Sequence, residues 1–184
     1  MPNWCENEVE IWGLPKQTAK DLHEAAKEGK LLQWIYPMPK ELEDTEAILE
    51  SGQGWYSWRV NNWGTKWDVD CHYYDVREYD GNSTVITLSF NSAWSPPRVA
   101  FEKLMEQYPE ISVDHYYFEP GCDYVGYNDT DYSPWEIYQA WKRNEHQSEE
   151  IMELDNRFRF IQNFADYEEE EEDDDENRES TSVV

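Results

Sequence analysis

The chain has 184 residues, of which 41 are Asp or Glu and 15 are Lys or Arg, so its formal net charge at pH 7 is −26. Between Glu168 and Val184, ten acidic residues and one arginine give a net charge of −9, which leaves −17 on residues 1–167. Such a chain repels nucleic-acid phosphates, whose binding depends on Lys and Arg. The composition therefore argues against direct nucleic-acid binding and favours basic partners, including proteins that normally hold nucleic acid.

The length of 184 residues fits one domain with an appendage, since a domain usually holds about 100–200 residues. No apolar run approaches the roughly 20 residues of a membrane-spanning helix. The N-terminal segment "MPNWCENEVEIWG" lacks the basic start and apolar region of a signal peptide. Cys5, Cys71 and Cys122 are too few and too scattered for a disulfide framework. We therefore expect a cytoplasmic protein that does not contact a membrane.

The first element predicted along the chain is a strand over residues 4–12, where small or apolar side chains alternate with three glutamates. This period of two is typical of a strand with one buried face. The segment "PKQTAKDLHEAAKEGK" predicts a helix that ends at Gly29. Residues 31–62 are predicted to be an irregular insertion, because the prolines of "YPMPKEL" interrupt a helix or a central strand. Within the insertion, "EDTEAILES" predicts a short helix.

A hairpin of two strands is predicted next. "DGNS" is a turn signal between the strand-like runs "WDVDCHYYDVREY" and "STVITLSFNSAW". "SPPRVAFEKLMEQYP" then predicts a helix that Ser95 caps, and "EISVDHYYFEPG" predicts a fourth strand. In the first run, alternation places Trp67, Val69, Cys71 and Tyr73 on one face and Asp68, Asp70 and His72 on the other.

This order of elements predicts a ferredoxin-like βαββαβ fold of the α+β class over residues 1–126, with two helices on one face of an antiparallel sheet. Residues 127–165 are predicted to be a helical extension. Ser133, Pro134 and Glu136 form a capping box at its start, and the helix should break near His146. Residues 166–184 are predicted to be a disordered acidic tail.

Three motifs in this order resemble a known family. "MPNWCENEVEIWG", "NNWGTKWD" and "FNSAWSPP" are similar to the Api92-like family of phages and plasmids, whose members carry a YubB-type ferredoxin-like domain. The resemblance covers residues 1–126 and implies the same fold, a mobile-element origin and a bacterial host cell. It implies no activity and no catalytic residues, and it does not extend to the C-terminal helices or the tail. This chain has Ser92 where the family form has Thr.

The corner where the second and third motifs should meet is the best candidate site. "NNWGTKWD" precedes the second strand and "SAWSPP" follows the third, so Trp63, Trp67 and Trp94 should cluster beside a helix N-terminus, which attracts anions. The spacing is not that of a P-loop. The structural alternative, which we prefer, is that the tryptophans are core and the asparagines bond the turn. The candidate ligand or partner residues are Asn61, Asn62, Trp63, Thr65, Lys66, Trp67, Trp94 and Ser95.

The open face of the predicted sheet gathers acidic side chains. RNA-binding domains of this fold need aromatic and basic groups there, so the carboxylates argue against RNA recognition. Clustered carboxylates can hold Mg²⁺, but a solvated face, or one covered by the C-terminal helix, is the simpler interpretation because fold analogy alone is weak. The cysteines lack zinc-ligand spacing, and we predict no metal and no cofactor. The predicted acidic face consists of Glu6, Glu8, Glu10, Asp68, Asp70 and His72, with Asp114 as a further candidate.

No pattern in the sequence specifies a reaction, and the serines of "SAWSPP" lack a nucleophile elbow. We therefore predict a non-catalytic acidic protein of a phage or plasmid that binds a basic host or self protein, where it mimics or competes with nucleic acid. The alternative is a small-ligand- or metal-binding enzyme that uses Trp63, Lys66, Trp67 and Trp94 with the sheet carboxylates. The acidic tail either takes part in binding or keeps the chain in solution.

Overall fold

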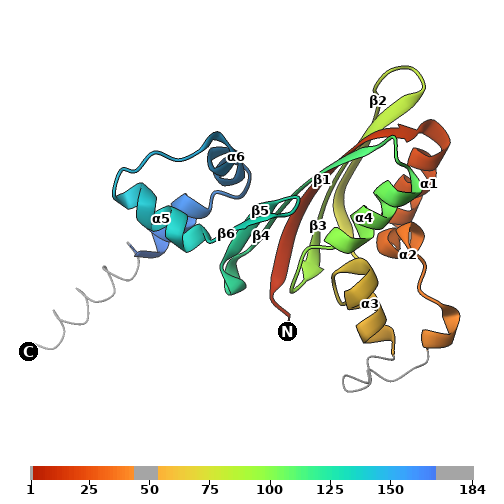
Figure 1. The fold of residues 1–184 in the computed structure, drawn as a ribbon, viewed down its shortest axis with the longest axis horizontal. Coiled ribbons are helices and arrows are strands. Elements are labelled where there is room, and N and C mark those ends of the chain that lie inside the picture. Colours follow the sequence, from red (N-terminus) through yellow and green to blue (C-terminus); the bar gives the residue numbers. More distant parts are fainter. Residues whose placement is uncertain (1, 44–53, 169–184) are drawn as a thin grey trace, which may run out of the picture.

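The computed structural model describes residues 2–43 and 54–168. Its centre is an antiparallel sheet with the strand order β2-β3-β1-β4-β5-β6 (Figure 1). The first four strands have the ferredoxin-like arrangement, which confirms the predicted fold class. The β5–β6 hairpin extends the sheet and was not predicted. The strands are β1 (Trp4–Pro15), β2 (Cys71–Glu78), β3 (Ser83–Ala93), β4 (Ser112–Glu119), β5 (Tyr124–Tyr127) and β6 (Thr130–Tyr132).

One face of the sheet is covered by helices, and the main core lies between the two layers (Figure 1). Alternate residues of β1, such as Val9 and Ile11, are buried there, as its period of two predicts. Gly29 has a φ of 67° and follows the last turn of the first helix, as predicted. The helices on this side are α1 (Lys16–Lys27), α2 (Leu31–Ile35), α3 (Trp55–Trp63) and α4 (Arg98–Gln107).

The prediction that residues 31–62 are irregular is wrong for α2 and α3. The α2 helix begins where the Asp68 carboxylate accepts the backbone amides of Leu32 and Gln33 at 2.8 and 2.9 Å. A cap this far along the sequence cannot be found from local pattern. The short helix predicted at "EDTEAILES" lies, except for Glu43, outside the described residues.

The second strand also differs from its prediction. It begins at Cys71 and not at Trp67, and its pairing with β3 shifts between Cys71 and Tyr73. A bulge of this kind reverses the side-chain alternation. Tyr74 therefore packs against His23 of α1 at 5.0 Å between ring centroids, while Tyr73 lies on the opposite, open face.

The C-terminal helices pack on the open face, at the β4–β5 end of the sheet (Figure 1). They are α5 (Pro134–Lys142), α6 (Glu149–Phe158) and the helical residues 160–168. The predicted break near His146 is confirmed, and Ser133 Oγ accepts the Glu136 amide at 3.1 Å as the predicted cap requires. Within the described residues, no helix is long and apolar enough to cross a membrane. A second core joins this unit to the sheet through Phe118, Val125, Ile137, Leu154, Phe158 and Phe160.

Candidate functional site

The sequence motifs meet at one end of the sheet. Thr65 Oγ1 donates a hydrogen bond to the carbonyl of Ala93 at 2.8 Å, and Ser95 Oγ donates to the carbonyl of Gly64 at 2.6 Å. The Trp94 amide donates to the carbonyl of Asn3 at 3.0 Å. The predicted meeting of "NNWGTKWD" with "SAWSPP" is therefore confirmed, and the N-terminal motif joins them.

Gly64 makes the turn of "NNWGTKWD" possible. Its φ of 89° is in the left-handed region, where it ends α3. A Cβ atom at Gly64 would lie 3.1 Å from the carbonyl oxygen of Pro96 and 3.3 Å from the amide of Arg98. Asn62 Nδ2 donates to the Trp58 carbonyl at 2.8 Å inside the helix. Asn61 is exposed on the same helix.

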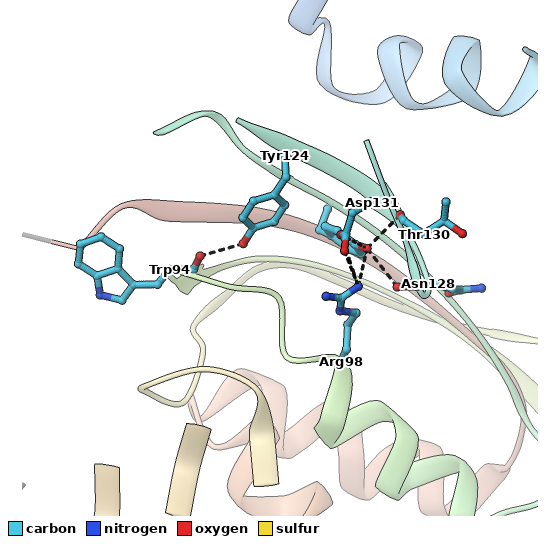
Figure 2. Close-up of polar contacts among 7 residues, drawn as sticks. Trp94, Arg98, Tyr124, Asn128, Thr130 and Asp131 are labelled. Atoms are coloured by element: carbon cyan, nitrogen blue, oxygen red, sulfur yellow. Dashed lines mark hydrogen bonds and ion pairs between the residues drawn. The ribbon is translucent and has the colours of Figure 1, made fainter. Parts of the chain in front are cut away.

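The three tryptophans of the corner do not form the predicted cluster. Trp63 is 1% exposed, and its indole nitrogen donates to the carbonyl of Tyr36 at 2.8 Å, so it belongs to the core. The ring of Trp67 lies 6.4 Å from the ring of Trp4. Trp94 is 45% exposed, and its side chain points away from the fold (Figure 2). The cluster is absent because α3, which was not predicted, carries Trp63 inward.

Two other parts of the predicted corner are occupied by the chain itself. The Lys66 ammonium lies 4.5 Å from the ring centroid of Trp67 and 5.7 Å from that of Tyr56, as cation–π contacts. The prediction that Ser95 caps the helix is wrong: α4 begins at Arg98, and the Ser95 hydroxyl bonds Gly64 instead. The proposed ligand site at this corner stays a prediction, and the side chains of Asn62, Thr65, Lys66 and Ser95 already contact other groups of the chain.

A buried polar network connects this corner to the middle of the sheet. His115 Nε2 lies 2.9 Å from Asn7 Oδ1. An amide oxygen only accepts, so Nε2 carries the proton. Asn7 Nδ2 donates to Ser92 Oγ at 2.9 Å, and Ser92 Oγ donates to the Ser95 carbonyl at 2.8 Å. This network, which was not predicted from the sequence, joins β1, β3 and β4 beneath α4.

Two buried titratable groups of this region, His115 and Cys5, are neutral at pH 7. Burial, with a smaller contribution from the charge of Arg98, lowers the pKa of His115 to about 3. Burial raises the pKa of the Cys5 thiol to about 12. A thiolate is the reactive form of cysteine, so Cys5 is not an activated nucleophile. In this network His115 is therefore a neutral hydrogen-bonding group, and the neighbouring Cys5 is a neutral thiol.

A second polar network ties the β5–β6 hairpin to the start of α4 (Figure 2). Arg98 Nη1 donates to Tyr117 Oη at 3.0 Å and forms an ion pair with Asp131 at 3.2 Å. Tyr117 Oη lies 2.8 Å from Asp131 Oδ1. Its remaining contacts are the carbonyls of Asn128 and Thr130, at 3.1 and 3.2 Å. The hairpin is thus held by groups that its own short strands do not provide.

Trp94 is an exposed residue with an unusual backbone. Its φ of 72° is rare for a bulky side chain. The amide of Trp94 donates a hydrogen bond to the Asn3 carbonyl. The Tyr124 hydroxyl donates one to the carbonyl of Trp94 at 2.8 Å (Figure 2). These two bonds fix the turn and direct the indole to solvent.

Four of the predicted acidic-face residues lie on the open face, namely Glu6, Glu8, Glu10 and His72. Glu8 accepts a hydrogen bond from Arg157 Nη1 at 2.7 Å, and this guanidinium lies 3.8 Å from the ring centroid of Tyr116. The α6 helix therefore reaches from the β4–β5 end of the sheet to β1 through the Arg157 side chain. It leaves a cavity of about 300 Å³ beside it, lined by Glu6, Glu8, His72, Tyr73 and Arg157 among others.

The prediction is wrong for Asp68 and Asp70, because the strand begins after them. Besides capping α2, Asp68 accepts the amide of Val69 at 2.9 Å, and burial raises the pKa of its carboxyl. Asp70 is exposed beside Gly29 on the helix side. Asp114 lies on the open face and accepts from the Tyr127 hydroxyl at 2.5 Å. Among residues 2–43 and 54–168, no three His, Cys, Asp or Glu side chains are arranged to hold a metal ion.

The comparisons with known proteins agree with the fold. A protein-family model described as the ferredoxin-like domain in Api92-like protein matches residues 73–182. The match begins inside β2 and includes the C-terminal helices, to which the resemblance of the three motifs does not extend. No curated protein and no solved structure matches the chain.

Proposed function

We propose that this chain, which belongs to the family of Api92-like proteins with a ferredoxin-like domain, is a non-catalytic acidic protein that binds a basic protein. The partner would be a host or self protein of a phage or plasmid, and the chain would compete there with nucleic acid. The family description names a fold and does not name an activity. The proposal therefore depends on the charge and contacts of the chain.

The observation that carries the proposal is that most Lys and Arg side chains already form ion pairs within the chain. Of the 15 Lys and Arg residues, most take part in ion pairs with carboxylates of the same chain, while 41 acidic residues leave a large surplus. Among residues 2–43 and 54–168, few cations are therefore left for phosphates, whereas unpaired carboxylates attract basic surfaces. The ion-paired cations are Lys16, Lys27, Lys30, Arg77, Arg98, Lys103, Lys142, Arg143 and Arg157.

The open face supports the proposal with a row of acidic positions. Glu6, Glu8 and Glu10 occupy every second position of β1, so their Cα atoms follow one another about 7 Å apart. Glu8 is neutralised by Arg157, and the negative charge of this row comes from the two outer residues. A linear array of negative charge is the feature by which nucleic acid attracts basic proteins.

A capture experiment with nuclease-treated host lysate tests the proposal. The immobilised chain should retain a defined basic protein at about 0.3 M salt, and added duplex DNA should displace it. The double variant Glu6→Gln/Glu10→Gln should weaken retention more than Glu102→Gln/Glu110→Gln, which removes the same charge from exposed positions in α4 and in the turn before β4. Recovery of abundant ribosomal proteins alone, lost at moderate salt and equally from both variants, would refute it.

A further inference from the structure

The C-terminal helices carry apolar side chains that folding does not bury. Trp141 of α5 is 49% exposed and Met152 of α6 is 56% exposed. Both line a groove of about 290 Å³ between the helices. Its other lining residues are His146, Gln147, Ile151, Asp155, Asn156 and Ile161. Exposed large apolar groups gathered around a hollow, unlike scattered ones, indicate a binding surface.

The groove has a defined shape because the residues that line it are fixed by contacts with the rest of the C-terminal helices. Trp141 stacks on Tyr138 with 5.9 Å between ring centroids and 18° between ring planes. Asp155 Oδ1 accepts the amide of Ile161 at 2.9 Å, which fixes the start of the last helix against α6. Leu154, one position before Asp155, is fully buried in the second core. The exposed wall is therefore carried on elements that the sheet anchors.

The rim of the groove is acidic. Glu149 lies one turn before Met152 on the same face of α6, because residues three apart are neighbours on a helix. The nearby cations Lys142 and Arg143 form ion pairs with Glu168 and Glu145, each at 2.6 Å. An apolar floor with a negative rim complements a helix that carries apolar residues on one side and basic residues beside them.

We propose that this groove binds a basic amphipathic helix of the partner protein. The inference rests on the proposed function, because it assigns the contact through which an acidic chain would hold a basic protein. The apolar side of the partner helix would lie on Trp141 and Met152, and its Lys or Arg residues would face Glu149 and Asp155. The acidic tail of the chain itself does not suit this site, since its charge has the same sign as the rim.

The test uses the full chain and three labelled synthetic peptides. The first is an 18-residue helix of Leu on one side and Lys on the other; the second has the same composition in scrambled order; the third alternates Gly and Lys. Binding is measured by fluorescence anisotropy. Two groove variants, Met152→Gln and Trp141→Gln, are compared with Val60→Gln, which changes an exposed apolar residue of α3 that is 39% exposed. Melting curves establish that each variant is folded.

The amphipathic peptide should bind at least tenfold more tightly than the scrambled one. Each groove variant should weaken it about tenfold, as expected for the loss of an apolar anchor, and Val60→Gln should not. If the Gly–Lys peptide binds equally well and the groove variants have no effect, the groove inference is wrong and the acidic-protein proposal stands. If no basic peptide binds, both fail. A dimer in sedimentation that Met152→Gln dissociates would assign the groove to a second copy and overturn the inference.

Discussion

The buried imidazole of His115 gives the protein a pH dependence of stability that follows from its surroundings. The side chain is 2% exposed, and its ring lies edge-on to Phe101 and Tyr117, with centroids 5.1 and 5.4 Å apart. Burial lowers its pKa to about 3, from about 6.5 in an unfolded chain. Between these values the unfolded chain binds a proton that the folded protein does not. The stabilisation is therefore present above pH 6.5 and is lost as the pH falls toward 3.

The size of this effect follows from the difference in bound protons. Where the unfolded histidine is protonated and the folded one is not, the free energy of unfolding falls by about 1.4 kcal/mol per pH unit. Between pH 7 and pH 5 the loss due to His115 is about 2 kcal/mol, because the unfolded histidine is only partly protonated near pH 6.5. A domain of this kind is stable by about 5–15 kcal/mol, so the loss is measurable.

Urea unfolding of the wild type and of His115→Gln, followed by tryptophan fluorescence at pH 7, 6 and 5, measures the effect. A glutamine amide can still donate to Asn7 Oδ1 and does not titrate. Protonation of the many surface carboxylates relieves charge repulsion in both proteins, so the difference between their pH profiles is the quantity to compare. The wild type should lose about 2 kcal/mol more than the variant between pH 7 and pH 5. Parallel profiles would refute the reasoning.

Further predictions concern the glycine turn, the Tyr117 network and the α6 contact. Gly64→Ala should lower the free energy of unfolding by about 2 kcal/mol or more. Gly81 also has a positive φ, of 84°, but no atom lies within 4 Å of a Cβ placed there, so Gly81→Ala should lower it by about 1 kcal/mol. Equal losses in urea unfolding would contradict the steric argument. Tyr117→Phe should cost about 1–2 kcal/mol in thermal melting, and an unchanged melting temperature would mean that water replaces the hydroxyl. Arg157→Gln should cost about 1 kcal/mol and speed amide exchange in α6 but not in β3; unchanged exchange would show that the Glu8 ion pair does not hold the helix.

The parts of the fold that local pattern specifies were predictable. The alternation of β1 and β3, the turn at "DGNS" and the cap at Ser133 each depend on residues close together in the chain. The α2 helix was not predictable, because Asp68, which caps it, lies beyond the far end of the predicted insertion. The bulge at Tyr73 changes the face of every later side chain in β2, and "WDVDCHYYDVREY" alternates too regularly to reveal it.

The candidate site was predictable in its position but not in its contacts. The strand order alone brings Gly64 and Ser95 together, since both flank the same end of one hairpin. The buried network had a signal that was not used. His115 lies between Val113 and Tyr117 on the inward face of β4, and Asn7 is at an inward position on the neighbouring strand β1. Two inward polar residues on adjacent strands must bond each other or something else, because burial without a partner is costly.

The residues of the three sequence motifs and the residues proposed to bind a partner lie in different parts of the molecule. Asn7, Gly64, Ser92 and Ser95 bond one another or the backbone, so changes there should alter stability and, only through it, binding. Trp141 and Met152 contribute little to either core, yet the matched span includes them. Variants in the groove should therefore change binding at constant melting temperature, and variants in the corner should do the reverse. This result would show that the C-terminal helices bind the partner and that the corner of Gly64 and Ser95 is structural. The opposite result would place the binding site at the corner.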